Sequence, residues 1–275
     1  MADASSSTIG PLFISVYGLK SVELPRAART ILCLHGVEAH GARYAALAAR
    51  LPEATIVAPD LRGHGRSPKH GPWTVEQHVR DLLPLTRRLG PRVIVLGHSY
   101  GGLLAWELAR EAHDQLAGLV LVDPAIAVAD YVVRDGAANS LIGHHWPDAP
   151  SAFQDMAEGR GAEAHWSVAL DVAIGLQRGD DGALREVAAP EAVGAAWQHM
   201  AARLRPTSWR GPTLLLEAGR ENGRFVSPWL IKALQEQLGD RLEHIVLDAP
   251  HTITADSPDL LAEHVREFVE GLLPR

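Results

Sequence analysis

Residues 97–102 read Gly-His-Ser-Tyr-Gly-Gly, directly after the apolar run Val93-Ile94-Val95-Leu96. A helix-forming stretch, Leu103 to His113, follows at once, so the pattern predicts a strand, a tight turn and a helix with Ser99 on the turn. Gly97 and Gly101 flank the serine without side-chain bulk, which a strained turn of this kind requires. The Ser99 hydroxyl then stands at a helix N-terminus, where free N–H groups favour developing negative charge. We therefore predict that Ser99 is a nucleophile.

Composition allows one large core, or a core with an inserted subdomain, because 47% of the 275 residues are hydrophobic. The net charge is −7, from 26 basic and 33 acidic side chains, and no run of Lys or Arg is long enough to follow a phosphate backbone. We therefore predict that the protein does not bind nucleic acid. The single cysteine, Cys33, lies in the apolar run Ile31 to Leu34 and is expected to be a small core residue.

The N-terminal residues Met-Ala-Asp-Ala-Ser-Ser-Ser-Thr contain neither a basic start nor an apolar segment of the kind that secretion signals carry. The sequence also has no run of eighteen apolar residues. One cysteine cannot form an internal disulfide, which fits a reducing compartment. These features predict a cytoplasmic protein without membrane insertion, in which the first residues form a short frayed leader.

Short apolar runs alternate with longer helical patterns along most of the chain. This alternation predicts an α/β protein with a mostly parallel sheet that is covered by helices on both faces. The expected strands are Leu12 to Tyr17, Ile31 to Leu34, Thr55 to Ala58, Val93 to Leu96, Leu119 to Val122, Thr213 to Leu216 and Ile245 to Leu247. The expected helices are Arg43 to Leu51, Val75 to Leu89, Leu103 to His113, Pro228 to Leu238 and Pro258 to Leu272.

The alternation stops between Pro124 and Pro206, where the sequence has helical periodicity without a strand signal. We predict a helical lid at 126–205 that is inserted into a core domain made of 1–125 and 206–275. An apolar pocket is expected where the lid meets the sheet. Three lid tryptophans are tentative substrate contacts, namely Trp146, Trp166 and Trp197.

Four motifs occur in the order in which the α/β-hydrolase superfamily has them, and the chain resembles that superfamily over essentially its whole length. They are His35-Gly36, the segment Asp60-Leu61-Arg62-Gly63-His64-Gly65-Arg66-Ser67, the elbow at Ser99, and Leu247-Asp248-Ala249-Pro250-His251. The resemblance implies an oxyanion hole made by the backbone N–H groups of Val37 and Tyr100. It also implies that His35 braces the oxyanion loop.

Fourteen histidines compete for the role of general base. His251 follows the last expected strand, which places its loop at the carboxyl edge of the sheet beside Ser99. His98 adjoins the nucleophile but points to the opposite side of an extended backbone, so we expect it to pack the elbow. His144, His145 and His165 lack Cys or carboxylate partners at metal-ligand spacing, and we predict neither a metal nor a cofactor. His251 is therefore our candidate base.

The sequence offers two candidates for the acid. Many family members place their aspartate three residues beyond a glycine after the strand expected at Thr213 to Leu216, but here Gly219-Arg220-Glu221-Asn222 puts an asparagine there. Asn222 cannot supply negative charge. Asp123, at the end of the run Leu119 to Val122, is our preferred acid because triads are defined by geometry and not by chain order. Glu221 is the alternative.

The predicted reaction is hydrolysis of a hydrophobic carboxylic ester or lactone through a Ser-His-Asp triad and an acyl-enzyme. The resemblance leaves alternatives open: a C–C bond hydrolase, a cofactor-independent oxygenase, or a non-catalytic receptor for a small hydrophobic ligand. Serine at the elbow argues against epoxide opening and halide displacement, which need aspartate there. Glu38, in the oxyanion loop, is expected to face solvent or to cap the helix that begins near Gly41.

Overall fold

The computed structural model describes residues 4–18, 29–221 and 223–272. Its centre is an eight-stranded sheet in the order β1-β2-β4-β3-β5-β6-β9-β10. Strands β4, β3, β5, β6, β9 and β10 are parallel, and β2 and β1 continue the sheet in antiparallel pairing. The strands are β1 (Ala4–Ile9), β2 (Leu12–Tyr17), β3 (Thr30–Leu34), β4 (Thr55–Pro59), β5 (Val93–His98), β6 (Leu116–Val122), β9 (Thr213–Ala218) and β10 (Leu242–Leu247). The predicted α/β fold with a mostly parallel sheet is confirmed.

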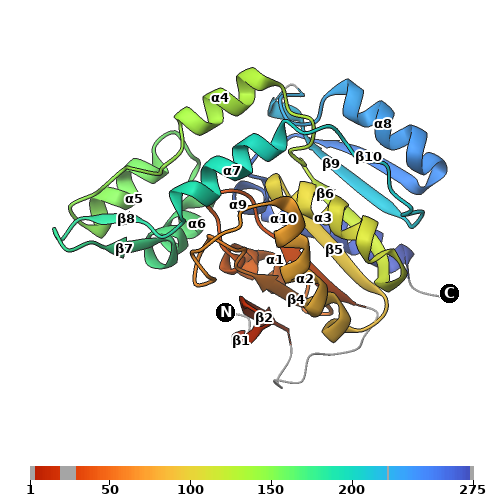
Figure 1. Cartoon of the computed structure of the whole chain (residues 1–275), viewed down its shortest axis with the longest axis horizontal. Coiled ribbons are helices and arrows are strands. Elements are labelled where there is room, and N and C mark those ends of the chain that lie inside the picture. Colours follow the sequence, from red (N-terminus) through yellow and green to blue (C-terminus); the bar gives the residue numbers. More distant parts are fainter. Residues whose placement is uncertain (1–3, 19–28, 222, 273–275) are drawn as a thin grey trace.

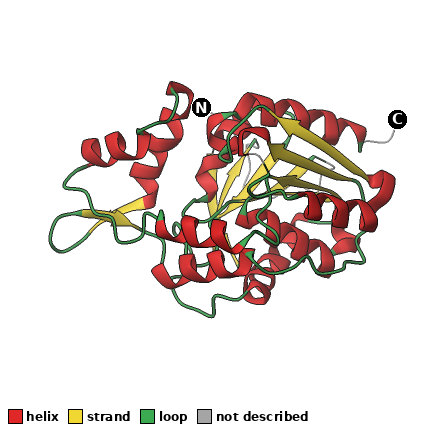
Figure 2. Ribbon diagram, turned by 90° about the horizontal axis from the view of Figure 1, so that it is seen from above, coloured by secondary structure: helices red, strands yellow, loops and turns green. Residues whose placement is uncertain are grey.

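Helices cover both faces of the sheet (Figures 1 and 2). Strand β5 explains the two layers, because Val93 and Val95 belong to one buried cluster, while Ile94 and Leu96 belong to the other. Helices α2 (Val75–Leu89), α3 (Tyr100–Glu111) and α8 (Pro228–Leu238) complete the first cluster. Helices α1 (Ala45–Arg50) and α10 (Pro258–Gly271) complete the second, which also buries Cys33 as expected.

Between β6 and β9 the chain leaves the sheet, and we call residues 124–212 the β6–β9 segment. It projects to one side of the sheet (Figure 1). It contains α4 (Asp130–Ala138), α5 (Ala149–Ala157), α6 (His165–Leu170) and α7 (Pro190–Met200). The expectation that it lacks strands is wrong, because β7 (Leu176–Arg178) and β8 (Leu184–Glu186) form a hairpin. Each strand has only three residues, too few for an alternating hydrophobic pattern to be seen in the sequence.

The two ends of the β6–β9 segment meet at the sheet. The N–H of Ala127 donates to the carbonyl of Ala202 over 3.1 Å, and the N–H of Val128 donates to that of Met200 over 2.9 Å. The segment therefore enters and leaves the core through a narrow neck.

The expectation of a frayed N-terminal leader is also wrong from Ala4 onward, since Ala4–Ile9 forms the edge strand β1. Its Ser and Thr residues carry little hydrophobic signal, and the strand forms through backbone pairing with β2. Residues 1–3 lie outside the described part of the chain. Among residues 4–18, 29–221 and 223–272, none of the helices is long and apolar enough to cross a bilayer.

Candidate active site

The elbow at Ser99 has the strained backbone that its sequence predicts, with φ 54° and ψ −120°. A Cβ on Gly97 would lie 2.2 Å from the carbonyl oxygen of Gly101, and one on Gly101 would lie 2.1 Å from that of Leu34. At Gly102 it would lie 2.6 Å from Cβ of Pro124. Each glycine is therefore required because backbone or a rigid ring occupies the space of a side chain.

Three side chains from the ends of β5, β6 and β10 form one hydrogen-bonded chain. Nε2 of His251 lies 3.0 Å from Oγ of Ser99, and Nδ1 of His251 lies 2.5 Å from Oδ2 of Asp123. The other carboxylate oxygen of Asp123 accepts from the N–H of Ala218 at 3.0 Å. Since Asp123 can only accept when ionised, this network assigns the proton to Nδ1 and leaves Nε2 to accept from the serine hydroxyl.

Glu221, the alternative acid, contacts the backbone of His251 and not its ring. Its Oε1 accepts from the His251 N–H at 2.9 Å. Glu221 ends a 3-10 turn, Gly219–Glu221, that follows β9. Asn222, which the sequence argument set aside as an acid, lies outside the described residues.

The oxyanion loop packs directly on the elbow. A Cβ on Gly36 would lie 3.2 Å from Cβ of Ser99, so the loop contacts the serine at Gly36. Val37 is the next residue. Tyr100 is the first residue of α3, where backbone N–H groups lack partners within the helix. Nε2 of His35 accepts from the N–H of Leu61 at 2.9 Å, while its Nδ1 donates to the Gly36 carbonyl at 2.7 Å. His35 thus ties the loop to the segment after β4.

His98 packs behind the elbow and supports the histidine loop. Its Nε2 donates to the carbonyl oxygen of His251 at 2.8 Å. Burial, together with the nearby His251, lowers the pKa of His98 to about 3, so its ring is neutral at physiological pH. The described residues contain no group of three or more His, Cys, Asp or Glu placed to hold a metal ion.

Phe225 is a neighbour of His251 that the sequence argument missed. Its ring is stacked on the imidazole, with centroids 3.7 Å apart and planes inclined by 15°. Phe225 is 6% exposed and lies just before α8. A single phenylalanine in a loop carries no sequence signal for such a contact, because the contact depends on how two loops meet.

The expectation for Glu38 is wrong. Its carboxylate neither faces solvent nor caps a helix: it accepts from the hydroxyl of Ser140 and, at 3.2 Å, from the N–H of Ile142. Burial raises the pKa of Glu38 above its ordinary value. Because Glu38 directly follows Val37, the oxyanion loop is bonded to the β6–β9 segment. Its φ of 57° turns the chain sharply at this point.

A buried ion pair makes a second link to the β6–β9 segment. Nε of Arg43 lies 2.7 Å from Oδ1 of Asp171, and Nη2 of Arg43 lies 2.7 Å from Oδ2. Nε2 of His40 lies 3.2 Å from Oδ1. Burial raises the pKa of Asp171, but the opposite effects of Arg43 and His40 are larger together and lower it to about 2. The planar, bidentate geometry suits arginine in particular.

The three tryptophans named as tentative substrate contacts lie in different environments. Trp146 is buried in a small cluster within the β6–β9 segment, and its Nε1 donates to Asp155 at 2.8 Å. Trp197, on α7, packs against the core cluster and closely against Gly136 of α4. Trp166 faces an open cleft.

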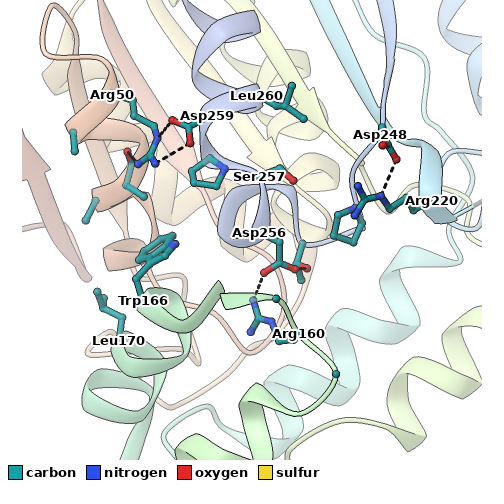
Figure 3. Close-up of a pocket in the computed structure, with 18 of the residues that line it drawn as sticks. Arg50, Arg160, Trp166, Leu170, Arg220, Asp248, Asp256, Ser257, Asp259 and Leu260 are labelled. Atoms are coloured by element: carbon teal, nitrogen blue, oxygen red, sulfur yellow. Dashed lines mark hydrogen bonds and ion pairs between the residues drawn. The ribbon is translucent and has the colours of Figure 1, made fainter. Parts of the chain in front are cut away.

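That cleft has a volume of about 1260 Å³ and lies between α6, α1 and the start of α10. Figure 3 shows Trp166 beside it, with three arginine–aspartate pairs around it. The pairs are Arg50–Asp259, Arg160–Asp256 and Arg220–Asp248. Its described lining includes Pro250 and Thr252 but neither Ser99 nor His251. The cleft therefore borders the histidine loop without including these two residues.

A serine elbow after β5 and a histidine loop after the last strand of a mostly parallel sheet define the α/β-hydrolase fold. The chain belongs to the alpha/beta hydrolase family, whose family model matches residues 31–264.

Known relatives agree with this assignment. Lipase LipV of Mycobacterium tuberculosis is 34% identical over 248 residues, which are 88% of this chain and 94% of that protein. A putative 2-succinyl-6-hydroxy-2,4-cyclohexadiene-1-carboxylate synthase of Bacillus subtilis is 24% identical over 278 residues, covering 91% and 93% of the two chains. The crystal structure of E-2-(acetamidomethylene)succinate hydrolase superposes with a TM-score of 0.82 at 22% identity, and the match covers 98% of this chain and 100% of that one.

Proposed function

We propose that this protein is a serine hydrolase that cleaves a hydrophobic carboxylic ester or lactone. The observation that carries the proposal is the hydrogen-bonded chain from Ser99 through His251 to Asp123, with spacings of 3.0 and 2.5 Å. Such a chain makes a serine hydroxyl nucleophilic because the imidazole can take its proton as attack begins. The relative named a lipase supports ester cleavage as the reaction class.

In the first half-reaction, Nε2 of His251 takes the Ser99 proton and Oγ attacks the substrate carbonyl. The negative charge of Asp123 stabilises the imidazolium that forms. The imidazolium then gives its proton to the departing alkoxide, and an acyl-enzyme remains on Ser99. Water, deprotonated by the same nitrogen, releases the acid and restores the serine.

The oxyanion of each tetrahedral intermediate is held by the N–H groups of Val37 and Tyr100 in this proposal. Two features support it: Gly36 packs against Ser99, and Tyr100 begins α3. A helix N-terminus favours negative charge at the position the oxyanion takes. One donor of this kind is worth on the order of 3 kcal/mol of transition-state stabilisation.

We further propose that residues 126–205 act as a lid on the core formed by 1–125 and 206–275. The neck at Ala127 and Ala202 and the links from Glu38 and Arg43 support this role. The proposal of a medium-sized hydrophobic or aromatic substrate rests on the apolar composition of this segment, because Trp146 and Trp197 pack within the protein and the cleft beside Trp166 does not include Ser99. The cytoplasmic location inferred from the sequence stays a prediction.

The test is reaction of the purified protein with a fluorophosphonate probe and a p-nitrophenyl ester series, with Ser99→Ala as the comparison. The proposal expects labelling and many turnovers in the wild type and neither in Ser99→Ala. Ester turnover that persists in Ser99→Ala would exclude Ser99 as the nucleophile. Oxygen uptake with an N-heteroaromatic substrate and no esterase activity would favour the oxygenase alternative, and binding without turnover would favour the receptor.

A further inference from the structure

The loop that carries His251 is held at four places. Asp123 bonds Nδ1 of the ring, and His98 donates to the carbonyl oxygen. Glu221 accepts from the backbone N–H at 2.9 Å, and the ring of Phe225 lies parallel to the imidazole at 3.7 Å. The last two contacts belong to no step of the mechanism proposed above.

Both contacts come from one segment, the connection between β9 and α8. Its Arg220 also donates its backbone N–H to the carbonyl of Ala249 at 3.2 Å. This connection therefore lies alongside the histidine loop and contacts it with two hydrogen bonds to the backbone of that loop and one aromatic face. Its Glu221 stands near the position at which many relatives carry their acid, yet it contacts backbone only.

The stack has two physical consequences for the imidazole. A ring lying flat at 3.7 Å prevents rotation about the Cβ–Cγ bond, which keeps Nε2 directed at Ser99 and Nδ1 directed at Asp123. The π face of phenylalanine also stabilises a cation above it, and an imidazolium forms during each half-reaction. His251 is one-fifth exposed, so Phe225 provides cover on a side that Asp123 and Ser99 leave open.

We propose that Phe225 and Glu221 are positioning residues for the base: Phe225 fixes the plane of the His251 ring, and Glu221 fixes its backbone. The inference rests on the proposed serine hydrolase function. The β9–α8 connection then holds the histidine and does not supply the acid.

The central test compares Phe225→Leu with Phe268→Leu. Phe268 is a matched control because it is 8% exposed and belongs to the buried cluster on the other face of the sheet, where its ring lies beside Gly118 of β6. Both variants lose a buried aromatic ring, so both lower the melting temperature. Only Phe225→Leu is expected to lower kcat, by about ten- to a hundredfold, with KM within about twofold of wild type.

The pH dependence of kcat/KM separates positioning from packing. In Phe225→Leu the acid limb is expected to move to lower pH, because the face that stabilises the imidazolium is gone. Phe225→Tyr, which keeps the aromatic face, restores kcat and the wild-type profile. If Phe225→Leu has the same kcat and pH profile as Phe268→Leu, the inference is wrong.

Glu221 is tested by a second pair. Glu221→Gln keeps an oxygen that accepts from the His251 N–H, so its kcat stays near wild type, whereas Glu221→Ala loses the contact and lowers kcat. Loss of activity in Glu221→Gln equal to that in Asp123→Asn would make Glu221 the acid and overturn its positioning role.

A readout independent of turnover keeps the inference testable if the hydrolase proposal fails. With ¹³C-labelled histidine, the ring protons of His251 are assigned by comparison with a His251→Asn variant. They are expected to resonate upfield in the wild type, owing to the ring current of Phe225, and to move downfield in Phe225→Leu. Unchanged resonances would refute the stack, whereas an inactive wild type with the shift present would refute only the hydrolase proposal.

Discussion

The carboxylate of Asp123 lies 2.5 Å from Nδ1 of His251, although 128 positions of sequence separate the two residues. Asp123 ends β6, and its second oxygen is fixed by the N–H of Ala218 at the end of β9. Parallel strands bring their carboxyl ends to one edge, so a residue after β6 and one after β10 can meet across β9. Glu221, the other candidate acid, contacts the backbone N–H of His251 instead of its ring.

Asp123→Asn is expected to lower kcat by about 10⁴-fold, because an amide favours the wrong imidazole tautomer and cannot stabilise the imidazolium. Ester hydrolysis with saturating substrate measures it. Asp240→Asn, a substitution on the exposed turn before β10, serves as the control and should match wild type. Near-normal kcat in Asp123→Asn would show that another group supplies the negative charge.

Gly101→Ala is expected to abolish ester hydrolysis and to destabilise the fold, since the new Cβ would lie 2.1 Å from the carbonyl oxygen of Leu34. Gly194→Ala is the matched control in α7, where a Cβ meets nothing within 4 Å. There the substitution should stabilise the protein by about 0.5–1 kcal/mol through helix propensity. Thermal denaturation and esterase assays measure both; an active, stable Gly101→Ala would contradict the steric argument.

Asp171→Asn is expected to destabilise the protein by about 3 kcal/mol, because Arg43 would stay buried without its counter-charge. Residues 160–178 should also become more sensitive to limited proteolysis. Asp181→Asn breaks an exposed arginine–aspartate pair in the same segment and should change neither property measurably. If Asp171→Asn and Asp181→Asn have equal melting temperatures, the Arg43–Asp171 pair does not anchor the segment.

The melting temperature is expected to fall as pH decreases from 6.5 to 5. Burial lowers the pKa of His64 to about 4 and those of His78 and His98 to about 3, while an unfolded histidine titrates near 6.5. The unfolded chain therefore binds more protons in this window, so stability rises with pH and is lost as pH falls.

Two carboxyl groups act in the opposite direction: burial raises the pKa of Glu38, and burial with the neighbouring Glu38 raises that of Glu186 to about 8, so both favour proton uptake on folding. Burial also lowers the pKa of His35 well below its ordinary value, so His35, His64, His78 and His98 together outweigh the two carboxyl groups between pH 5 and 6.5. Differential scanning calorimetry over this range measures the balance. A melting temperature that rises on acidification would show that the two carboxyl groups outweigh the histidines.

Much of this architecture could be predicted because its determinants are local. The elbow depends on glycines at 97, 101 and 102, and each is required by a contact with nearby backbone or with Pro124. The parallel sheet follows from apolar runs that alternate with amphipathic helices. The order of the strands then brings Ser99, Asp123 and His251 to one edge, as their places after the strands suggested.

What could not be predicted depends on contacts between distant loops. The bond of Glu38 to Ser140 joins positions 102 apart, and the stack of Phe225 on His251 needs two loops to meet at a particular angle. The hairpin of β7 and β8 and the edge strand β1 are formed largely by backbone hydrogen bonds, which leave little pattern in side-chain hydrophobicity.

The narrow neck at Ala127 and Ala202 has a consequence for the evolution and the engineering of this protein. Because Ser99, Asp123 and His251 all lie outside the loop that this neck closes, a replacement of that loop leaves the strands of the sheet in place, but it must supply new partners for Glu38 and Arg43. A chimera joined at these two points therefore needs matching changes at positions 38 and 43 as well as the new segment.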